Sequence, residues 1–141
     1  MENPTTRLAR FVSLPPKERV RLFAAAVLLA TARLGVKAAG VSRTRQLLSR
    51  LSPGFRVEPE RLADLVRMAC QALPGATSCL PRAIVLEALL RAARHPAELR
   101  IGVASRNGGQ RLPAHAWVEV DGIAVAEDPS RYTALPVFGT R

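Results

Sequence analysis

The apolar pattern of this 141-residue chain changes its period at His95-Pro96. Before this point, apolar residues recur every three or four positions, which is the spacing of a helix that buries one face. After it, residues 98–104 and 114–120 alternate between polar and apolar side chains, as half-buried strands do. Helices followed by antiparallel strands predict an α+β fold with a helical N-terminal half.

The helical part divides at proline and glycine residues. Residues 1–14 have little periodicity and are expected to form an arm. We expect four helices after it: a long apolar helix from Lys17 to about Lys37, a short basic one over 41–51, one from about Glu58 to Leu73, and one from Cys79 to about Arg94.

The strand part is predicted to be an antiparallel meander. After the first strand, Asn107-Gly108-Gly109 is expected to form a turn, and Asp121-Gly122 is typical of a type I′ hairpin turn. The third strand is expected over 123–127, and a short fourth one over 135–138.

The chain is strongly basic, with a net charge of +10. This charge favours an acidic partner such as nucleic acid, a membrane surface or an acidic peptide. One Trp and one Tyr leave little aromatic surface for stacking bases, so no nucleic acid is expected. The longest uncharged run, Leu22 to Ala32, falls short of the roughly 20 residues that span a bilayer, so no membrane span is expected.

Two cysteines do not make a disulfide framework, and no secretory signal is visible, so we expect a reduced, cytoplasmic protein. The cysteines and the two histidines lack the C-x-x-C and H-x-x-x-H spacings of metal sites. Neither G-x-x-x-x-G-K-[ST] nor G-x-G-x-x-G occurs, so nucleotide binding by such loops is unsupported. No cofactor and no metal is expected.

Cys79 stands where a loop becomes an apolar helix, within the stretch from Thr77 to Leu90. A helix N-terminus favours the thiolate, which is the nucleophilic form of cysteine. Its free N–H groups can also receive the oxyanion that forms at an attacked carbonyl. Cys79 is therefore a candidate nucleophile, whereas Cys70 is expected to be a buried cysteine at a helix end.

The hairpin supplies a candidate base and a candidate carboxylate. If Asp121 and Gly122 form a two-residue loop, His115 lies opposite Asp128. Opposed side chains project to the same face with Cβ atoms about 5 Å apart, close enough for a carboxylate to orient an imidazole. A loop of odd length would shift the pairing by one and bring Glu127 to the histidine instead.

Three segments in this order, residues 74–83, 97–103 and 114–122, resemble the lasso peptide biosynthesis B2 proteins. These are leader peptidases of the transglutaminase-like superfamily. The resemblance implies a papain-like core, with a nucleophile helix packed on a small antiparallel sheet. By position, it implies Cys79 as nucleophile, His115 as general base and acid, and Asp128 as orienting carboxylate. Members of the family often carry the acid at the place of Glu127.

The resemblance implies a cysteine peptidase that removes the leader from a lasso precursor peptide before a cyclase closes the ring. A separate recognition protein, B1, presents the leader in such systems. We therefore expect residues 1–57 to be a helical segment and candidate docking surface, and residues 58–141 to be the catalytic core. Two other functions stay open: acyl transfer to an amine, and a non-catalytic basic scaffold.

Overall fold

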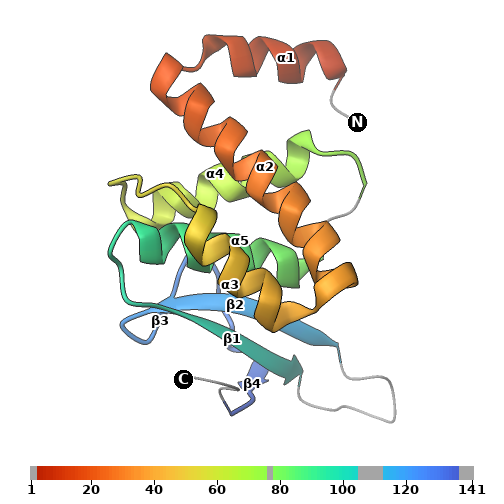
Figure 1. Cartoon of the computed structure of the whole chain (residues 1–141), viewed down its shortest axis with the longest axis vertical. Helices are drawn as coiled ribbons and strands as arrows, with labels where there is room; N and C mark the ends of the chain where they lie inside the picture. Colours follow the sequence, from red (N-terminus) through yellow and green to blue (C-terminus); the bar gives the residue numbers. More distant parts are fainter. Residues whose placement is uncertain (1–2, 76–77, 105–112, 137–141) are drawn as a thin grey trace.

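The computed structural model describes residues 3–75, 78–104 and 113–136. Within these residues the chain forms five helices and then a four-stranded antiparallel sheet (Figure 1). The helices are α1 (Pro4–Ser13), α2 (Pro16–Ala39), α3 (Val41–Leu51), α4 (Pro59–Ala72) and α5 (Cys79–Ala92), and the strands are β1 (Ala97–Ala104), β2 (Ala114–Val120), β3 (Ile123–Ala124) and β4 (Tyr132–Ala134). The predicted α+β class is confirmed.

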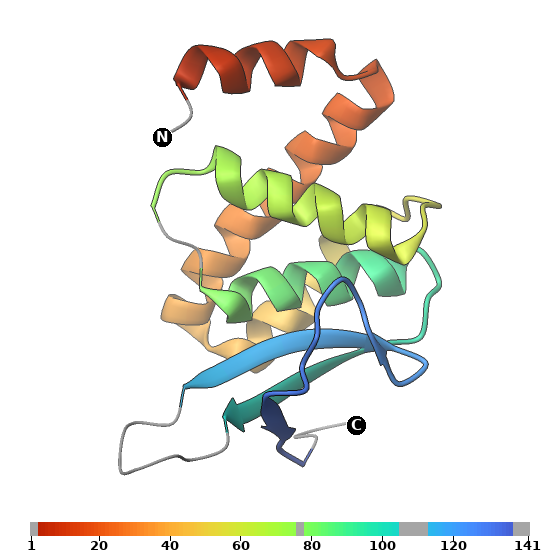
Figure 2. The ribbon, with the colours of Figure 1, turned by 180° about the vertical axis from the view of Figure 1, so that it is seen from behind.

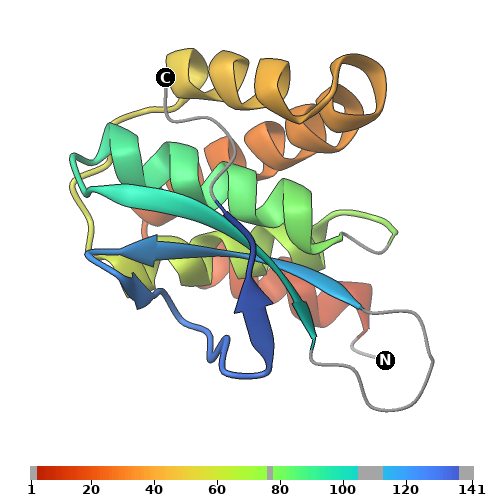
Figure 3. The same ribbon diagram turned by 90° about the horizontal axis from the view of Figure 1, so that it is seen from below.

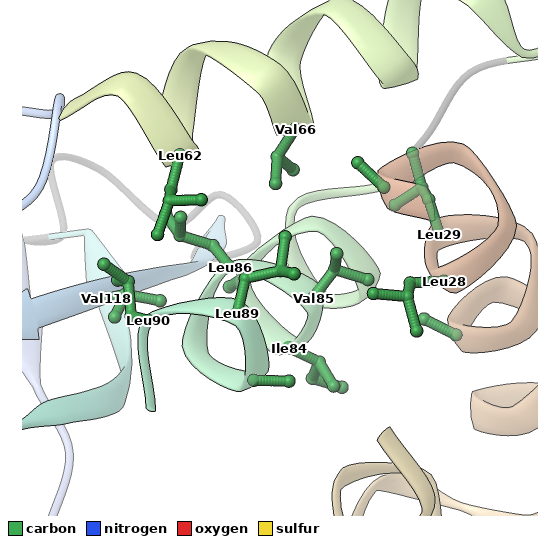
Figure 4. Packing of buried hydrophobic residues seen from close by; sticks show 14 of the residues in the cluster. Leu28, Leu29, Leu62, Val66, Ile84, Val85, Leu86, Leu89, Leu90 and Val118 are labelled. Carbon is green, nitrogen blue, oxygen red and sulfur yellow. The ribbon is translucent and has the colours of Figure 1, made fainter. Parts of the chain in front are cut away.

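Helix α5 is the centre of the fold because most of its residues are buried. It lies between the sheet on one side and α2, α3 and α4 on the other (Figure 1). In Figure 4 the side chains of α5 lie among Leu62 from α4, Leu28 from α2 and Val118 from β2. One hydrophobic core thus joins residues on both sides of position 57.

The sheet has the order β3-β2-β1-β4. Strands β1, β2 and β3 follow each other as a meander, and the hairpin register pairs Val120 with Ile123 as predicted. Asp121 and Gly122 both have positive φ, so the predicted type I′ turn is confirmed. From β3 the chain crosses to β4, which pairs with the opposite edge of β1 (Figures 2 and 3).

Three details differ from the sequence-based expectations. Residues 4–13 form a helix rather than an arm. The sequence did not indicate this helix because Leu8, Phe11 and Val12 have helical spacing but are too few to give a long periodic pattern. Strand β3 ends at Ala124 because Ala126 has a positive φ that turns the chain. Strand β4 is formed by Tyr132–Ala134, and residues 135–136, where the fourth strand is expected to begin, are not in a strand. The rest of that expected strand and the turn expected at 107–109 lie outside the described residues.

Helix α2 is the one described helix whose length and hydropathy would suffice to cross a membrane. Its buried residues, among them Leu22, Leu28 and Leu29, belong to the hydrophobic core. The opposite side of α2 leaves Val20, Phe23 and other apolar residues exposed. A cytoplasmic location stays a prediction.

An ion pair between the buried Glu87 and the half-buried Arg45 connects α3 to α5. Glu87 is 3% exposed and accepts two hydrogen bonds from Arg45, at 2.9 Å from Nε and 2.6 Å from the terminal nitrogen. Arg91 adds a third contact at 3.2 Å. The two parallel bonds have the bidentate geometry in which arginine binds carboxylates most strongly.

Glu87→Ala is expected to lower the free energy of unfolding by about 1.5–3 kcal/mol, because the half-buried Arg45 guanidinium loses both of its hydrogen bonds to the carboxylate. The matched control is Glu98→Ala, since Glu98 forms an exposed pair with Arg100 that should contribute no more than about 1 kcal/mol. Urea denaturation measures both. Equal losses in the two variants would contradict a structural role for the Arg45–Glu87 pair.

Candidate active site

Cys79 is the first residue of α5 and is half-buried. Ser78 occupies the N-cap position in extended conformation, but its side chain makes no capping hydrogen bond. The N–H groups of the first turn are therefore left uncapped by that side chain. They can stabilise an anion at this end of the helix.

His115 is held by a carboxylate from the crossing segment between β3 and β4. Its Nε2 lies 2.5 Å from Oε2 of Glu127. An ionised carboxylate can only accept, so Nε2 carries the proton and Nδ1 presents a lone pair. The imidazole can thus take a proton at Nδ1 while Glu127 stabilises the resulting positive charge.

Arg82 ties this pair to the nucleophile helix. Its guanidinium donates to the other oxygen of Glu127, Oε1, at 3.2 Å. Arg82 stands three residues after Cys79, and side chains three apart share one face of a helix. The first turn of α5 and the start of β2 also lie at the same end of the molecule in Figures 1, 2 and 3. Cys79 therefore shares a face of α5 with Arg82, which contacts the carboxylate that holds His115.

The expected contact of His115 with Asp128 is wrong. The hairpin pairing continues through Val125, whose N–H donates to the carbonyl of Val118 at 2.9 Å. The left-handed backbone of Ala126 then breaks the alternation, so Glu127 reaches the histidine one residue earlier. The sequence left Glu127 open as the alternative partner of His115, on the assumption of a loop of odd length. In the structure the change of register comes instead from the backbone of Ala126.

Asp128 has a different role in the structure. Its Oδ1 accepts a hydrogen bond from the backbone N–H of Ser130 at 3.0 Å, which is an Asx-type turn. This backbone hydrogen bond, with a second from the Ser130 side chain, lowers the pKa of Asp128. The carboxylate is exposed and shapes the bend that leads toward β4.

Two aromatic residues flank the imidazole. The ring of Tyr132, from β4, stacks on His115 with 4.8 Å between centroids, and Trp117 stacks at 6.2 Å. Trp117 lies over Gly102, where a Cβ atom would come within 2.7 Å of the indole ring. The glycine in β1 thus makes room for Trp117, and the crossing to β4 brings Tyr132 onto the histidine.

A cavity of about 400 Å³ runs from Glu127 along one face of α5 to α4. Arg82, Ala83 and Leu86 line it, and they stand three, four and seven residues after Cys79. This is the spacing of a single helix face, so these three lining residues lie on the same face of α5 as Cys79, which itself does not line the cavity. Trp117 and Val125 contribute apolar walls.

The model of the transglutaminase-like superfamily matches residues 11–139, nearly the whole chain. The chain belongs to the transglutaminase-like superfamily. Neither a comparison with curated proteins nor one with solved structures finds a match. In this transglutaminase-like protein the match spans both the helical segment and the sheet. Members of the superfamily are generally enzymes of the cysteine type, which act as peptidases or in acyl transfer.

Sequence reasoning missed two residues of this transglutaminase-like site, Arg82 and Tyr132. Arg82 could have been found from its spacing, because it stands one helical turn after the candidate nucleophile. Tyr132 carried no signal, since its contact depends on the crossing of the chain to the far edge of the sheet. Among the described residues, no group of three or more His, Cys, Asp or Glu is arranged to hold a metal ion.

Proposed function

We propose that this protein is a cysteine peptidase in which Cys79 is the nucleophile, His115 the general base and acid, and Glu127 the orienting carboxylate. The observation that carries the proposal is the pair of contacts made by Glu127, with His115 at 2.5 Å and with Arg82 at 3.2 Å. Through Arg82 these contacts connect the histidine to the turn of α5 that begins with the cysteine. Cysteine, histidine and an orienting carboxylate are the parts that thiol catalysis needs.

In the first half of the reaction, Nδ1 of His115 accepts the thiol proton and the sulfur of Cys79 attacks the scissile carbonyl. N–H groups at the start of α5 stabilise the oxyanion. The carbon–nitrogen bond then breaks, and the protonated imidazole gives its proton to the leaving amine. A thioester remains on Cys79.

In the second half, a water molecule gives a proton to His115 and attacks the thioester. The carbon–sulfur bond breaks, the peptide leaves as a carboxylic acid, and the thiol regains its proton. Glu127 keeps the imidazole in one tautomer throughout.

The specific role that we propose is removal of the leader from a lasso precursor peptide. Its support is the resemblance of residues 74–83, 97–103 and 114–122 to the lasso B2 proteins. In this role a separate B1 protein presents the leader, and a cyclase acts on the released core peptide. The basic surface of the chain, with its net charge of +10, is suited to an acidic peptide or protein partner.

The test is to incubate a precursor peptide with this protein, with and without the recognition protein, and to record the masses of the products. Hydrolysis at the leader–core junction should give two fragments whose masses sum to the precursor plus one water. An added amine donor should leave these masses unchanged. A precursor that stays intact under all conditions would rule out the peptidase.

Acyl transfer is the second candidate, because the superfamily includes acyl-transfer enzymes. It requires an amine, rather than water, to attack the same thioester. A leader fragment whose mass shows the added amine joined to it would therefore identify the protein as a transferase and contradict the peptidase proposal. Steep, salt-dependent binding to DNA without either product would favour the non-catalytic scaffold.

A further inference from the structure

We infer that Tyr132 is a positioning residue, whose ring lies on the imidazole of His115 and fixes the plane of that imidazole. The inference rests on the proposed function in taking His115 as the base. Tyr132 is the first residue of β4 and is half-buried. Its ring centroid lies 4.8 Å from that of His115, with an angle of 30° between the two planes. Rings stacked at such a distance attract each other beyond the area that they bury.

The hydrogen bond to Glu127 restrains the imidazole at one atom only. Nε2 of His115 lies 2.5 Å from Oε2 of the carboxylate, but a ring held at one corner can still tilt about that contact. Rotation about the bond between Cβ and Cγ of a histidine is only weakly restricted. A second ring against the face of the imidazole removes this freedom. The two contacts together therefore fix both the direction and the plane of the base.

One segment of the chain delivers both contacts. Glu127 and Tyr132 stand five residues apart on the segment that crosses from β3 to β4 (Figure 3). Oδ1 of Asp128 accepts from the N–H of Ser130 at 3.0 Å, and the N–H of Tyr132 donates to the carbonyl of Pro129 at 2.9 Å. Pairing of β4 with β1 then anchors the end of the segment. The ring of Tyr132 therefore has a defined place beside the histidine.

Gly102 of β1 makes room for this arrangement. It is the cross-strand partner of His115, so a side chain there would project to the same face of the sheet as the imidazole. A Cβ atom on Gly102 would come within 2.7 Å of the ring of Trp117 and within 2.9 Å of the carbonyl oxygen of Thr133. Glycine at this position thus lets β4 and the indole approach closely enough for Tyr132 to reach the histidine.

Trp117 supports the ring of Tyr132 from a second side. Its ring centroid lies 6.3 Å from that of Tyr132 and 6.2 Å from that of His115, so the three rings are mutual neighbours. The indole is itself held, because Nε1 donates to Oε1 of Glu119 at 3.0 Å. Nε of Arg100 donates to the other oxygen of Glu119 at 3.1 Å. Tyr132 therefore rests against a ring that polar contacts keep in place.

The first measurement is the rate of precursor cleavage by full-length variants. Tyr132→Leu removes the ring and should lower kcat by about tenfold with KM changed by less than about twofold, because a misplaced base slows the chemistry and not the binding. Tyr132→Phe keeps the ring that makes the contact and should recover most of the lost activity. The matched control is Thr133→Val, which changes the next residue of the same strand and should alter kcat by less than about twofold.

The second measurement reports the imidazole without catalysis. Full-length Cys79→Ala protein is labelled with ¹⁵N-histidine and studied by NMR at alkaline pH. The two nitrogens of His115 should have widely separated shifts, as in a single tautomer, and Tyr132→Leu should move these shifts toward each other because a freed ring exchanges between tautomers. Tyr132→Phe should keep the separation. The chain has one other histidine, His95, so the signals that His115→Ala removes are identified directly.

Two outcomes would overturn the inference. Tyr132→Leu could leave the shifts of His115 unchanged, which would mean that the ring does not orient the imidazole, whatever the loss of rate. Tyr132→Phe could be as impaired as Tyr132→Leu, which would assign the effect to the hydroxyl. Circular dichroism checks folding, and Tyr132→Met serves if Tyr132→Leu does not fold. If the shifts respond as expected but the wild-type protein does not cut a precursor, the peptidase proposal fails and the positioning role stands.

Discussion

Cys79→Ala is expected to reduce precursor cleavage by about 10⁵-fold or more, because it removes the nucleophile on which the whole reaction depends. His115→Ala should cost about as much, since members of one catalytic unit do not contribute additively. The measurement is the rate of leader release, followed by mass spectrometry with the recognition protein present. Intact mass should also show an acyl-enzyme on the wild type and none on Cys79→Ala.

The matched control is Cys70→Ala, which replaces the second of the two cysteines in the chain. Cys70 lies in the last turn of α4 and packs against the hydrophobic core. Its loss should change the rate of cleavage by no more than about twofold. Leader release that persists in Cys79→Ala, or disappears equally in Cys70→Ala, would contradict the assignment of the nucleophile.

The regular parts of the fold could be predicted because each has a strong local signal. Gly40 ends α2 with a positive φ, Ser78 stands before α5, and Asp121-Gly122 forms the predicted type I′ turn. The sequence could not reveal α1, because its apolar residues are few and three of them remain exposed. It also could not place β4, because pairing with the far edge of β1 is a long-range contact with no local pattern.

The two residues of the candidate site that lie in a regular helix or strand could be predicted. Cys79 lies at a helix start and His115 near the start of a strand, where the sequence placed them. The identity of the carboxylate that orients His115 depended on the backbone conformation of one residue. Ala126 adopts φ 55°, a conformation that alanine rarely takes, so no propensity rule foresees the change of register.

The carboxylate that orients His115 can be identified by a direct comparison of Glu127 and Asp128. Glu127→Ala is expected to lower the rate of leader release by about 10³–10⁴-fold, because Nε2 loses its acceptor and the imidazole is no longer held in one tautomer. Asp128→Ala should change the rate by less than about threefold, since its carboxylate bonds to Ser130 in an exposed turn. Both rates come from the same precursor assay.

Glu127→Gln separates orientation of the histidine from a purely structural role. The amide oxygen of glutamine can still accept from Nε2, so this variant should recover part of the activity lost in Glu127→Ala. Arg82→Leu should leave most of the activity, because Glu127 keeps its contact with His115 when its other oxygen is freed. Thermal unfolding of Glu127→Ala, Glu127→Gln, Asp128→Ala and Arg82→Leu measures how much each substitution destabilises the fold. If Asp128→Ala proved as inactive as Glu127→Ala at equal stability, the contact between Glu127 and His115 would not be the one that catalysis uses.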